Sequence, residues 1–134
     1  MPEVRSATPE LERFARETLG CQCSAEVFDR IEDDHSPLPG MPEIRRRIAI
    51  GGRLLIYLAE VPDGPRASEQ VCDWIAAGVA ERDLRGMNRL RLVVALEGPT
   101  PETAAAIEQT FLGLRGLDDR VHLHVLPAEA LTGI

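Results

Sequence analysis

Residues 45–59 read RRRIAIGGRLLIYLA, two strand-like runs joined by a pair of glycines. Gly51 and Gly52 suit the positive φ angles of a two-residue type I′ turn, which connects antiparallel strands. We therefore expect strands over 45–50 and 53–59 that form a hairpin. The arginines of the first run are typical of a sheet edge, whereas the second run is apolar enough for the centre of a sheet.

Helical and strand-like segments alternate after this hairpin. Ser68 and Thr100 are good N-caps, so each predicts the start of a helix. The nearly continuous apolar run 90–96 predicts a buried strand, and the alternation over 120–126 predicts the last strand. Two right-handed crossovers then make the last three strands parallel. The predicted sheet has the strand order one-two-three-four, with the first strand antiparallel to its neighbour.

Two short helices are expected before the hairpin. Thr8 can cap the first and Ser24 the second. This N-terminal helix pair would cover the sheet face that the two crossover helices leave free. The predicted fold class is thus a single α/β domain over residues 1–134. It has a four-stranded mixed sheet, an antiparallel hairpin followed by a βαβαβ unit, with helices packed on it and loose ends over 1–7 and 128–134.

The composition is that of a globular protein and excludes several kinds of chemistry. Hydrophobic residues make up 44% of the chain and aromatic residues only 4%, so the core is built mainly from aliphatic side chains. The formal net charge of −7 argues against a nucleic-acid partner. The sequence contains no lysine, which excludes Schiff-base, phosphate-loop and general-base lysines. Arginine cannot replace lysine as a base because it keeps its proton.

Cysteine usage and hydropathy predict a cytoplasmic protein without membrane contact. The chain has three cysteines, an odd number that argues against a secreted disulfide framework. Residues 1–13 are polar and show no secretory signal. The longest apolar runs, 54–59 and 92–96, are too short to span a bilayer. A protein partner or a homo-oligomer remains open.

The stretch Gly20-Cys21-Gln22-Cys23-Ser24 is the main candidate for chemistry. The pair of thiols precedes an expected helix, whose free N–H groups and dipole favour thiolate over thiol. Such a pair can bind zinc or copper, form a readily exchanged disulfide, or hold an Fe–S cluster shared across a dimer. The alternative interpretation is that both cysteines only fill the corner between two helices.

The last predicted strand carries a second candidate pair. His122 and His124 alternate along it, so both side chains point to the same sheet face. Two imidazoles at this spacing can form half of a transition-metal site. If the crossover helices cover the opposite face, a metal set that combines the histidines with Cys21 and Cys23 is conceivable. The alternative interpretation is a polar face on an edge strand.

Two isolated residues complete the candidate metal or redox set. Cys72 lies in the first crossover helix, where it is either a further ligand, a resolving thiol or a core residue. His35 lies in an acidic loop twelve residues after Cys23, where it either joins a local Cys-Cys-His set or is solvated.

Two functional hypotheses follow from the sequence. The first is a thiol-based metal-binding, cluster-binding or redox protein that uses Cys21 and Cys23. The second is a non-catalytic interaction domain, homodimeric or bound to another protein, whose cysteines only pack. The chain has no nucleophile-elbow serine, dinucleotide-binding fingerprint or zincin helix. The sequence therefore leaves open whether the protein is an enzyme.

Overall fold

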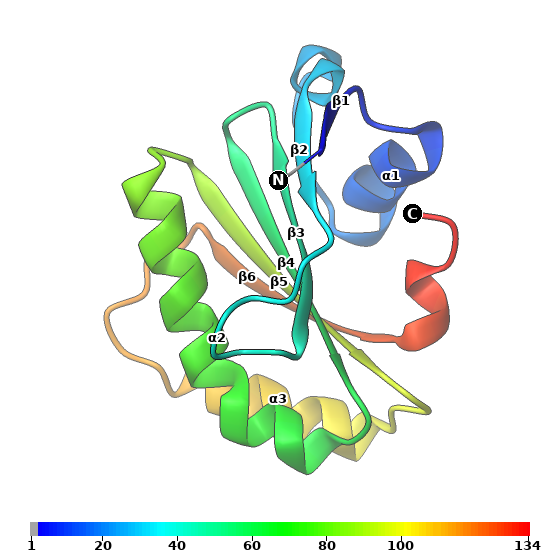
Figure 1. The fold of residues 1–134 in the computed structure, drawn as a ribbon. Helices are drawn as coiled ribbons and strands as arrows, with labels where there is room; N and C mark the ends of the chain where they lie inside the picture. Colours follow the sequence, from blue (N-terminus) through cyan, green and yellow to red (C-terminus); the bar gives the residue numbers. More distant parts are fainter. Residues whose placement is uncertain (1–2) are drawn as a thin grey trace.

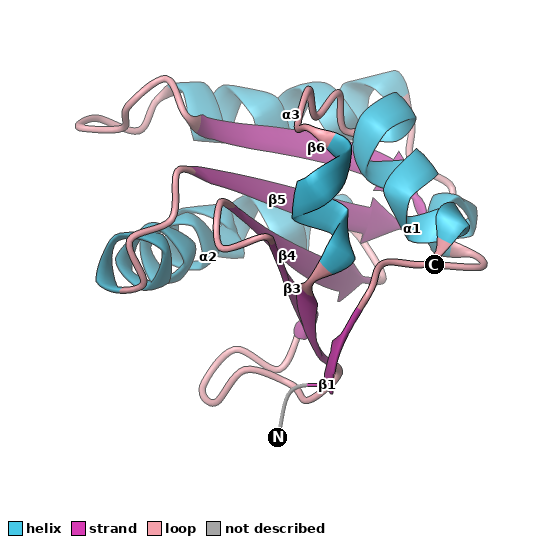
Figure 2. Cartoon of the chain, turned by 90° about the horizontal axis from the view of Figure 1, so that it is seen from above, coloured by secondary structure: helices cyan, strands magenta, loops and turns pink. Residues whose placement is uncertain are grey.

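A six-stranded mixed sheet lies between two layers of helices and turns in the computed structural model, which describes residues 3–134 (Figures 1 and 2). The strands are β1 (Glu3–Arg5), β2 (Ile31–Asp34), β3 (Ile44–Ile50), β4 (Leu54–Val61), β5 (Arg89–Leu96) and β6 (Val121–Pro127). They follow one another across the sheet in chain order. Strands β1 to β4 pair antiparallel, and β4, β5 and β6 pair parallel.

The hairpin and the two crossovers confirm the prediction for the second half of the chain. Gly51 and Gly52 form the β3–β4 turn with φ angles of 59° and 67°. The crossover helices α2 (Gly64–Leu84) and α3 (Pro101–Leu112) lie on the same face of the sheet (Figure 2). Helix α2 begins earlier than expected because Asp63, rather than Ser68, caps it by accepting a hydrogen bond from the Arg66 N–H.

The first half of the chain corrects the prediction of four strands and an N-terminal helix pair. The expected second helix is one 3₁₀ turn, Ala25–Asp29. The chain then extends into β2, where Ile31 and Asp33 are buried. The acidic residues of this segment argue against a buried strand when the sequence is read alone. In the structure the buried Asp33 carboxylate accepts hydrogen bonds from Arg5 and Arg46, which makes the strand possible. Arg46 of β3, which suggested a sheet edge in the sequence, therefore pairs with Asp33 of the neighbouring strand β2 inside the sheet.

The end segments 1–7 and 128–134, for which we expect loose structure, contain ordered elements where they are described; residues 1 and 2 lie outside the described part of the chain. Residues 3–5 form β1, and the C-terminal part contains a 3₁₀ turn, Ala128–Leu131. Leu131 and Ile134 pack against the same apolar cluster as the helix α1 (Pro9–Arg13). Figures 1 and 2 both show the C-terminus beside α1. The C-terminal end of the described chain thus contributes to the layer opposite α2 and α3, whereas its N-terminal end adds a strand to the sheet.

The two sheet faces carry separate apolar clusters because side chains alternate along each strand. In β4, Leu55 and Tyr57 face α2 and α3, whereas Leu54 and Ile56 face the N-terminal layer. We call the cluster under α2 and α3 the helix-side core and the other the N-terminal core. The N-terminal core also contains α1, the π-helical turn Phe14–Thr18 that continues it, and Cys21. The cysteine stretch is therefore placed over the sheet.

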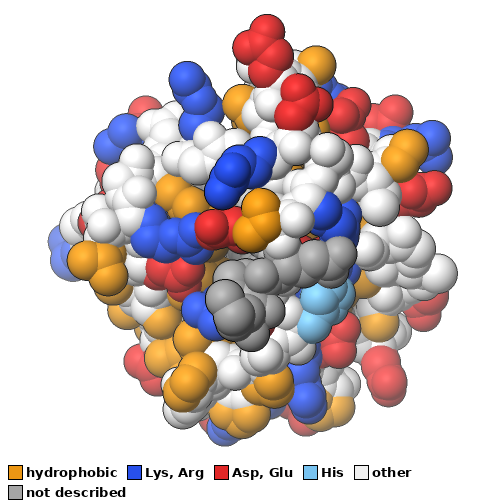
Figure 3. Space-filling model, turned by 45° about the horizontal axis from the view of Figure 1, so that its top comes forward, with side chains coloured by type: hydrophobic (Ala, Val, Ile, Leu, Met, Phe, Trp, Pro, Cys, Tyr) orange, Lys and Arg blue, Asp and Glu red, His pale blue; other side chains and the backbone are white. Residues whose placement is uncertain are grey.

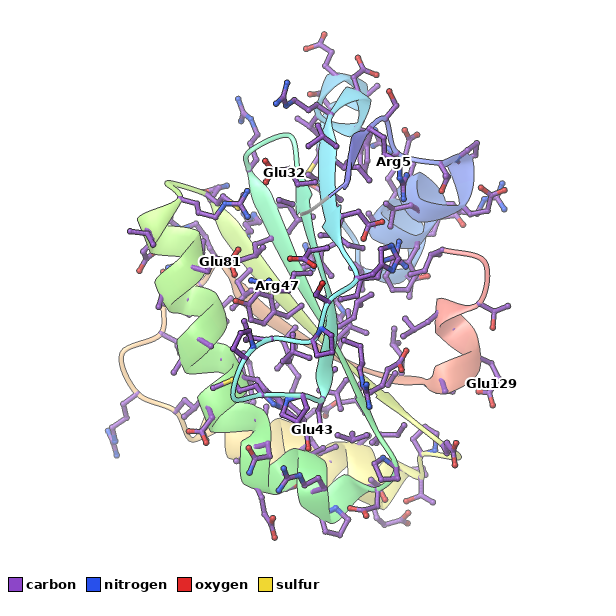
Figure 4. All side chains as sticks on the ribbon, in the orientation of Figure 1. Arg5, Glu32, Glu43, Arg47, Glu81 and Glu129 are labelled. Atoms are coloured by element: carbon purple, nitrogen blue, oxygen red, sulfur yellow. A yellow bond between two sulfur atoms is a disulfide. The ribbon has the colours of Figure 1, made fainter. Side chains whose placement is uncertain are left out.

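Ion pairs fasten α2 to the strands on the helix-side face. Arg47 lies 2.8 Å from an Asp34 oxygen and 3.3 Å from a Glu81 oxygen, and Figure 4 shows Arg47 and Glu81 facing each other between β3 and α2. The Tyr57 hydroxyl donates to Glu81 at 2.6 Å. Burial, followed by this hydrogen bond and the charge of Glu81, raises the pKa of Tyr57. In this cluster the positive charge of Arg47 is balanced by the carboxylates of Asp34 and Glu81.

The molecular surface seen in Figure 3 mixes acidic, basic and apolar side chains without one large patch of a single sign. Every basic side chain other than histidine is an arginine, since the chain has no lysine. In the part of the chain that the structure describes, no helix has the length and apolar character needed to cross a membrane.

Candidate functional site

The cysteine stretch is a short turn held by the end of the first helical segment. Gly20 leaves the helix with a φ angle of 77°, a conformation that favours glycine. The Cys21 N–H then donates to the Ala15 carbonyl at 2.9 Å. The Arg16 guanidinium donates to the Cys23 carbonyl at 2.9 Å. These bonds fix the backbone of the turn from its two ends.

Cys21 and Cys23 are joined by a disulfide, with their Cα atoms 5.6 Å apart. Cys21 is 7% exposed and belongs to the N-terminal core, whereas Cys23 is half-buried. The Cys23 N–H also donates to the Cys21 sulfur at 3.3 Å. One sulfur is therefore anchored in the apolar layer, and its partner belongs to the more accessible residue.

The disulfide lines a cavity of about 480 Å³ between the cysteine turn and the sheet. This size falls in the usual range of small-molecule sites. We call this cavity the arginine pocket, because three arginines and no acidic residue occur among the described residues that line it: Gly20, Cys21, Gln22, Cys23, Ser24, Val27, Arg53, Leu54, Asn88, Arg89 and Arg91.

The basic wall of the arginine pocket includes two arginines of β5, which bond to two histidines of β6. Arg89 and Arg91 alternate along β5, and His122 and His124 alternate along β6. The parallel register sets Arg91 beside His122. The hydrogen bonds between the arginine and histidine side chains run diagonally across the two strands. Arg89 Nη1 lies 3.0 Å from His122 Nε2, and Arg91 Nη1 lies 3.1 Å from His124 Nε2. Two arginine–histidine pairs thus cover the start of β5 and β6.

Burial and positive charge keep these histidines neutral. Burial, followed by the charges of Arg91 and His122, lowers the pKa of His124 to about 4. Burial and the charges of Arg91 and Arg89 also lower the pKa of His122. A neutral imidazole has one ring nitrogen free to accept a hydrogen bond. Each histidine can therefore accept from its arginine at neutral pH, and it adds no positive charge to the wall.

Arg91 is the unusual residue of the site. Only 8% of it is exposed, and its Nε has no hydrogen-bond partner in the described part of the chain. Burial, followed by the charge of Arg89, lowers the pKa of Arg91, but a guanidinium stays charged in proteins. The other buried arginine, Arg82, is 4% exposed and makes a bidentate pair with Asp118 at 2.7 and 3.0 Å. No such carboxylate pairs with Arg91 within residues 3–134.

The structure brings some of the sequence-predicted site residues together and separates others. His122 and His124 share a sheet face with Cys21 and Cys23, as the sequence pattern predicts, because Val121, Leu123 and Val125 pack on the helix-side core. The imidazoles bond to arginines, however. Among residues 3–134, no group of three or more Cys, His, Asp or Glu side chains could hold a metal ion. The four-residue metal set is therefore not assembled.

Cys72 and His35 lie in other surroundings. Cys72 is a free, half-buried thiol of α2 that packs against the helix-side core, on the opposite side of the sheet from the disulfide. The exposed His35 has its Nε2 3.2 Å from an Asp33 oxygen. Cys72 therefore fits the core interpretation of the sequence, and His35 belongs to the cluster around Asp33.

Sequence reasoning missed the three arginines of the pocket. Arg89 directly precedes the predicted strand 90–96 and alternates with Arg91, and His122 alternates with His124 near the start of the predicted strand 120–126. Neighbouring parallel strands with aligned starts bring such pairs side by side on one face. The two spacings indicated that Arg89 and Arg91 share a face, as do His122 and His124. Only the strand register shows that the two pairs lie side by side.

Comparisons with known protein families, curated proteins and solved structures find no match for this chain. The geometry and charge of the arginine pocket are therefore the features that point to a function.

Proposed function

We propose that this chain is a thiol–disulfide exchange protein in which Cys21 and Cys23 form the redox couple. The observation that carries the proposal is that their disulfide lines a cavity whose other wall contains Arg53, Arg89 and Arg91. Positive charge near a cysteine favours its thiolate, the form that reacts in exchange. The pocket thus combines a reactive bond, room for a small molecule and a field that stabilises the product.

The reductant in the proposed exchange is a low-molecular-weight thiol. Its thiolate attacks the sulfur of Cys23, the more exposed residue, and forms a mixed disulfide as the Cys21–Cys23 bond breaks. Cys21 leaves as a thiolate. A second thiolate then attacks the small molecule's sulfur in the mixed disulfide, releasing the oxidised small molecule and the Cys23 thiolate. Two electrons pass to the protein disulfide, and two small thiols become one disulfide.

The charge of the arginine pocket favours redox chemistry over the metal-binding hypothesis. A zinc or copper ion near Cys21 and Cys23 would share a wall with three guanidinium groups, whose positive charge repels a cation. The histidines that could complete a metal site already pair with Arg89 and Arg91. The same charges attract a thiolate. We therefore place redox exchange ahead of metal or cluster binding.

The proposed setting is a reducing cytoplasm, where a disulfide on a small loop can be reduced and formed again. The net charge of −7 supports a protein that works without nucleic acid. The alternative function is an interaction domain, alone or as a homodimer, in which the sulfur pair only packs. Burial of Cys21 in the N-terminal core favours that alternative, so the test must separate packing from exchange.

The test is a redox titration of the folded protein with a small thiol and its disulfide, followed by thiol labelling and mass analysis. We expect reversible two-electron reduction of Cys21 and Cys23 in the wild type and in Cys72→Ser, and none in Cys21→Ser/Cys23→Ser. Metal analysis of the reduced protein tests the competing hypothesis. A pair that neither reduces nor re-forms without unfolding would overturn the proposal in favour of packing, and stoichiometric zinc or iron lost in the double variant would overturn it in favour of a metal site.

A further inference from the structure

We propose that the arginine pocket binds the carboxylate or phosphate group of a small molecule through Arg91, assisted by Arg89 and Arg53. If the proposed exchange function holds, this group is the anionic part of the thiol substrate. The binding claim itself does not depend on the cysteines being reactive. It rests on the burial of Arg91 and on the absence of acidic partners for Arg53, Arg89 and Arg91 among residues 3–134.

Arg91 is a buried cation that lines the pocket. A buried charge is normally paired, because removing an unpaired ion from water is costly. Arg91 is 8% exposed, its Nε has no hydrogen-bond partner in the described chain, and it lines the pocket. Its Nη1 is occupied by the neutral His124. The guanidinium thus keeps its charge inside the protein, its buried Nε has no partner among the described residues, and the residue lines the cavity.

The other arginines of the fold show that this arrangement is unusual for the chain. Arg46, Arg47 and Arg82 are buried or half-buried, and each has a carboxylate oxygen within 2.8 Å. The same part of the chain supplies no carboxylate to Arg91. Folding therefore pairs internal arginines with acidic residues except at the arginine pocket. An oxyanion ligand would complete the pattern there.

The chemistry of the wall defines the class of ligand. A guanidinium offers parallel N–H donors that match the two oxygens of a carboxylate or a phosphate. Arg53 and Asn88 are exposed and line the same cavity, so they can contact the outer part of the ligand. Apolar Leu54 and Val27 also line it. The cavity of about 480 Å³ suits a small organic anion better than a bare inorganic ion.

The test measures binding of inorganic phosphate and of succinate by calorimetry at constant ionic strength, with neutral succinamide as the control. We expect saturable binding of at least one anion, with the two arms separating phosphate from carboxylate preference. Arg91→Gln should weaken it by at least about tenfold, because a charge-assisted hydrogen bond is lost. Arg53→Gln, at an exposed position of the same wall, provides a second variant whose folding is not at risk. Arg115→Gln, exposed and outside the pocket, is the matched control.

The outcomes separate this inference from the exchange function. Anion binding that persists in Cys21→Ser/Cys23→Ser but is lost in the Arg91 and Arg53 variants supports the pocket, whether or not the cysteines exchange. Binding that is equal in wild type, Arg91→Gln and Arg53→Gln would overturn the inference. So would the absence of saturable binding of both anions, even if the redox titration supports the exchange function.

Discussion

Two buried arginines of this fold should respond to the same substitution with opposite changes in stability. Arg91→Met and Arg82→Met each remove a guanidinium and retain an apolar stem of similar width. Arg82 is 4% exposed and pairs with Asp118 and Asp83. Arg91 is 8% exposed and has no carboxylate partner among residues 3–134. The pair therefore isolates the effect of compensation at nearly equal burial.

The expected magnitudes follow from the contacts. Loss of Arg82 removes charged hydrogen bonds to carboxylates that are themselves partly exposed, so we expect about 1–3 kcal/mol of lost stability. Loss of Arg91 removes one hydrogen bond to His124 of about 1 kcal/mol. It also removes the desolvation penalty of an unpaired ion, which is several kcal/mol. Arg91→Met should thus stabilise the ligand-free protein by about 1–2 kcal/mol.

The assay is equilibrium unfolding in urea, monitored by the fluorescence of the buried Trp74, in a buffer without phosphate or carboxylates. Arg91→Met should raise the unfolding midpoint and Arg82→Met should lower it, with similar denaturant slopes. If Arg91→Met loses as much stability as Arg82→Met, Arg91 has an internal compensating partner, and the physical basis of the proposed anion site is removed.

Three further predictions concern pH, packing and helix capping. Because burial and neighbouring arginine charge lower the pKa of His124 from 6.5 to about 4, the unfolded chain binds more protons between these values. The contribution of the neutral His124 to the free energy of unfolding is complete above pH 6.5. It is lost as the pH falls to about 4, which lowers the stability by at most about 3 kcal/mol. His124→Gln should flatten urea-unfolding stability over this range, and an unchanged slope would contradict the assignment. Gly64→Ala should lower the thermal midpoint because the new Cβ would overlap the Thr103 side chain. Gly113→Ala, where the nearest atoms are 3.5 Å away, should change it little, and equal effects would refute this packing argument. Thr100→Ala should cost about 1 kcal/mol by removing the cap of α3, and unchanged urea unfolding would exclude a stabilising role for that cap.

The parts of the fold that could be predicted are those specified by local patterns. Gly51-Gly52 determines the hairpin, and the helical segments on either side of the apolar run 90–96 determine the two crossovers, although only the cap of α3 was predicted at the right residue. Strand β2 could not be predicted in the same way. Its buried Asp33 becomes acceptable only when Arg46 from β3 and Arg5 from β1 reach it. Such pairing between distant segments overrides the local preference of an acidic stretch.

The features of the candidate site can also be separated into those that local sequence predicts and those that depend on the tertiary structure. The close approach of Cys21 and Cys23 follows from their covalent spacing. The sheet face of His122 and His124 follows from the two-residue period of a strand and the handedness of the crossovers. The role of Arg91 does not follow from the sequence, because its burial and lack of an acidic partner depend on which strand lies beside β5 and in what register.

The two proposed activities depend on one source of positive charge. Arg53, Arg89 and Arg91 line the same cavity as the disulfide, so a free anion bound there in place of the substrate's own anionic group would weaken the field that favours a Cys21 or Cys23 thiolate. Binding of such a free anion and reduction of the disulfide are then thermodynamically linked, and each must oppose the other to the same extent. This coupling also explains why an uncompensated arginine would be kept inside a small fold: an acidic partner would stabilise Arg91 but cancel the charge that both activities use.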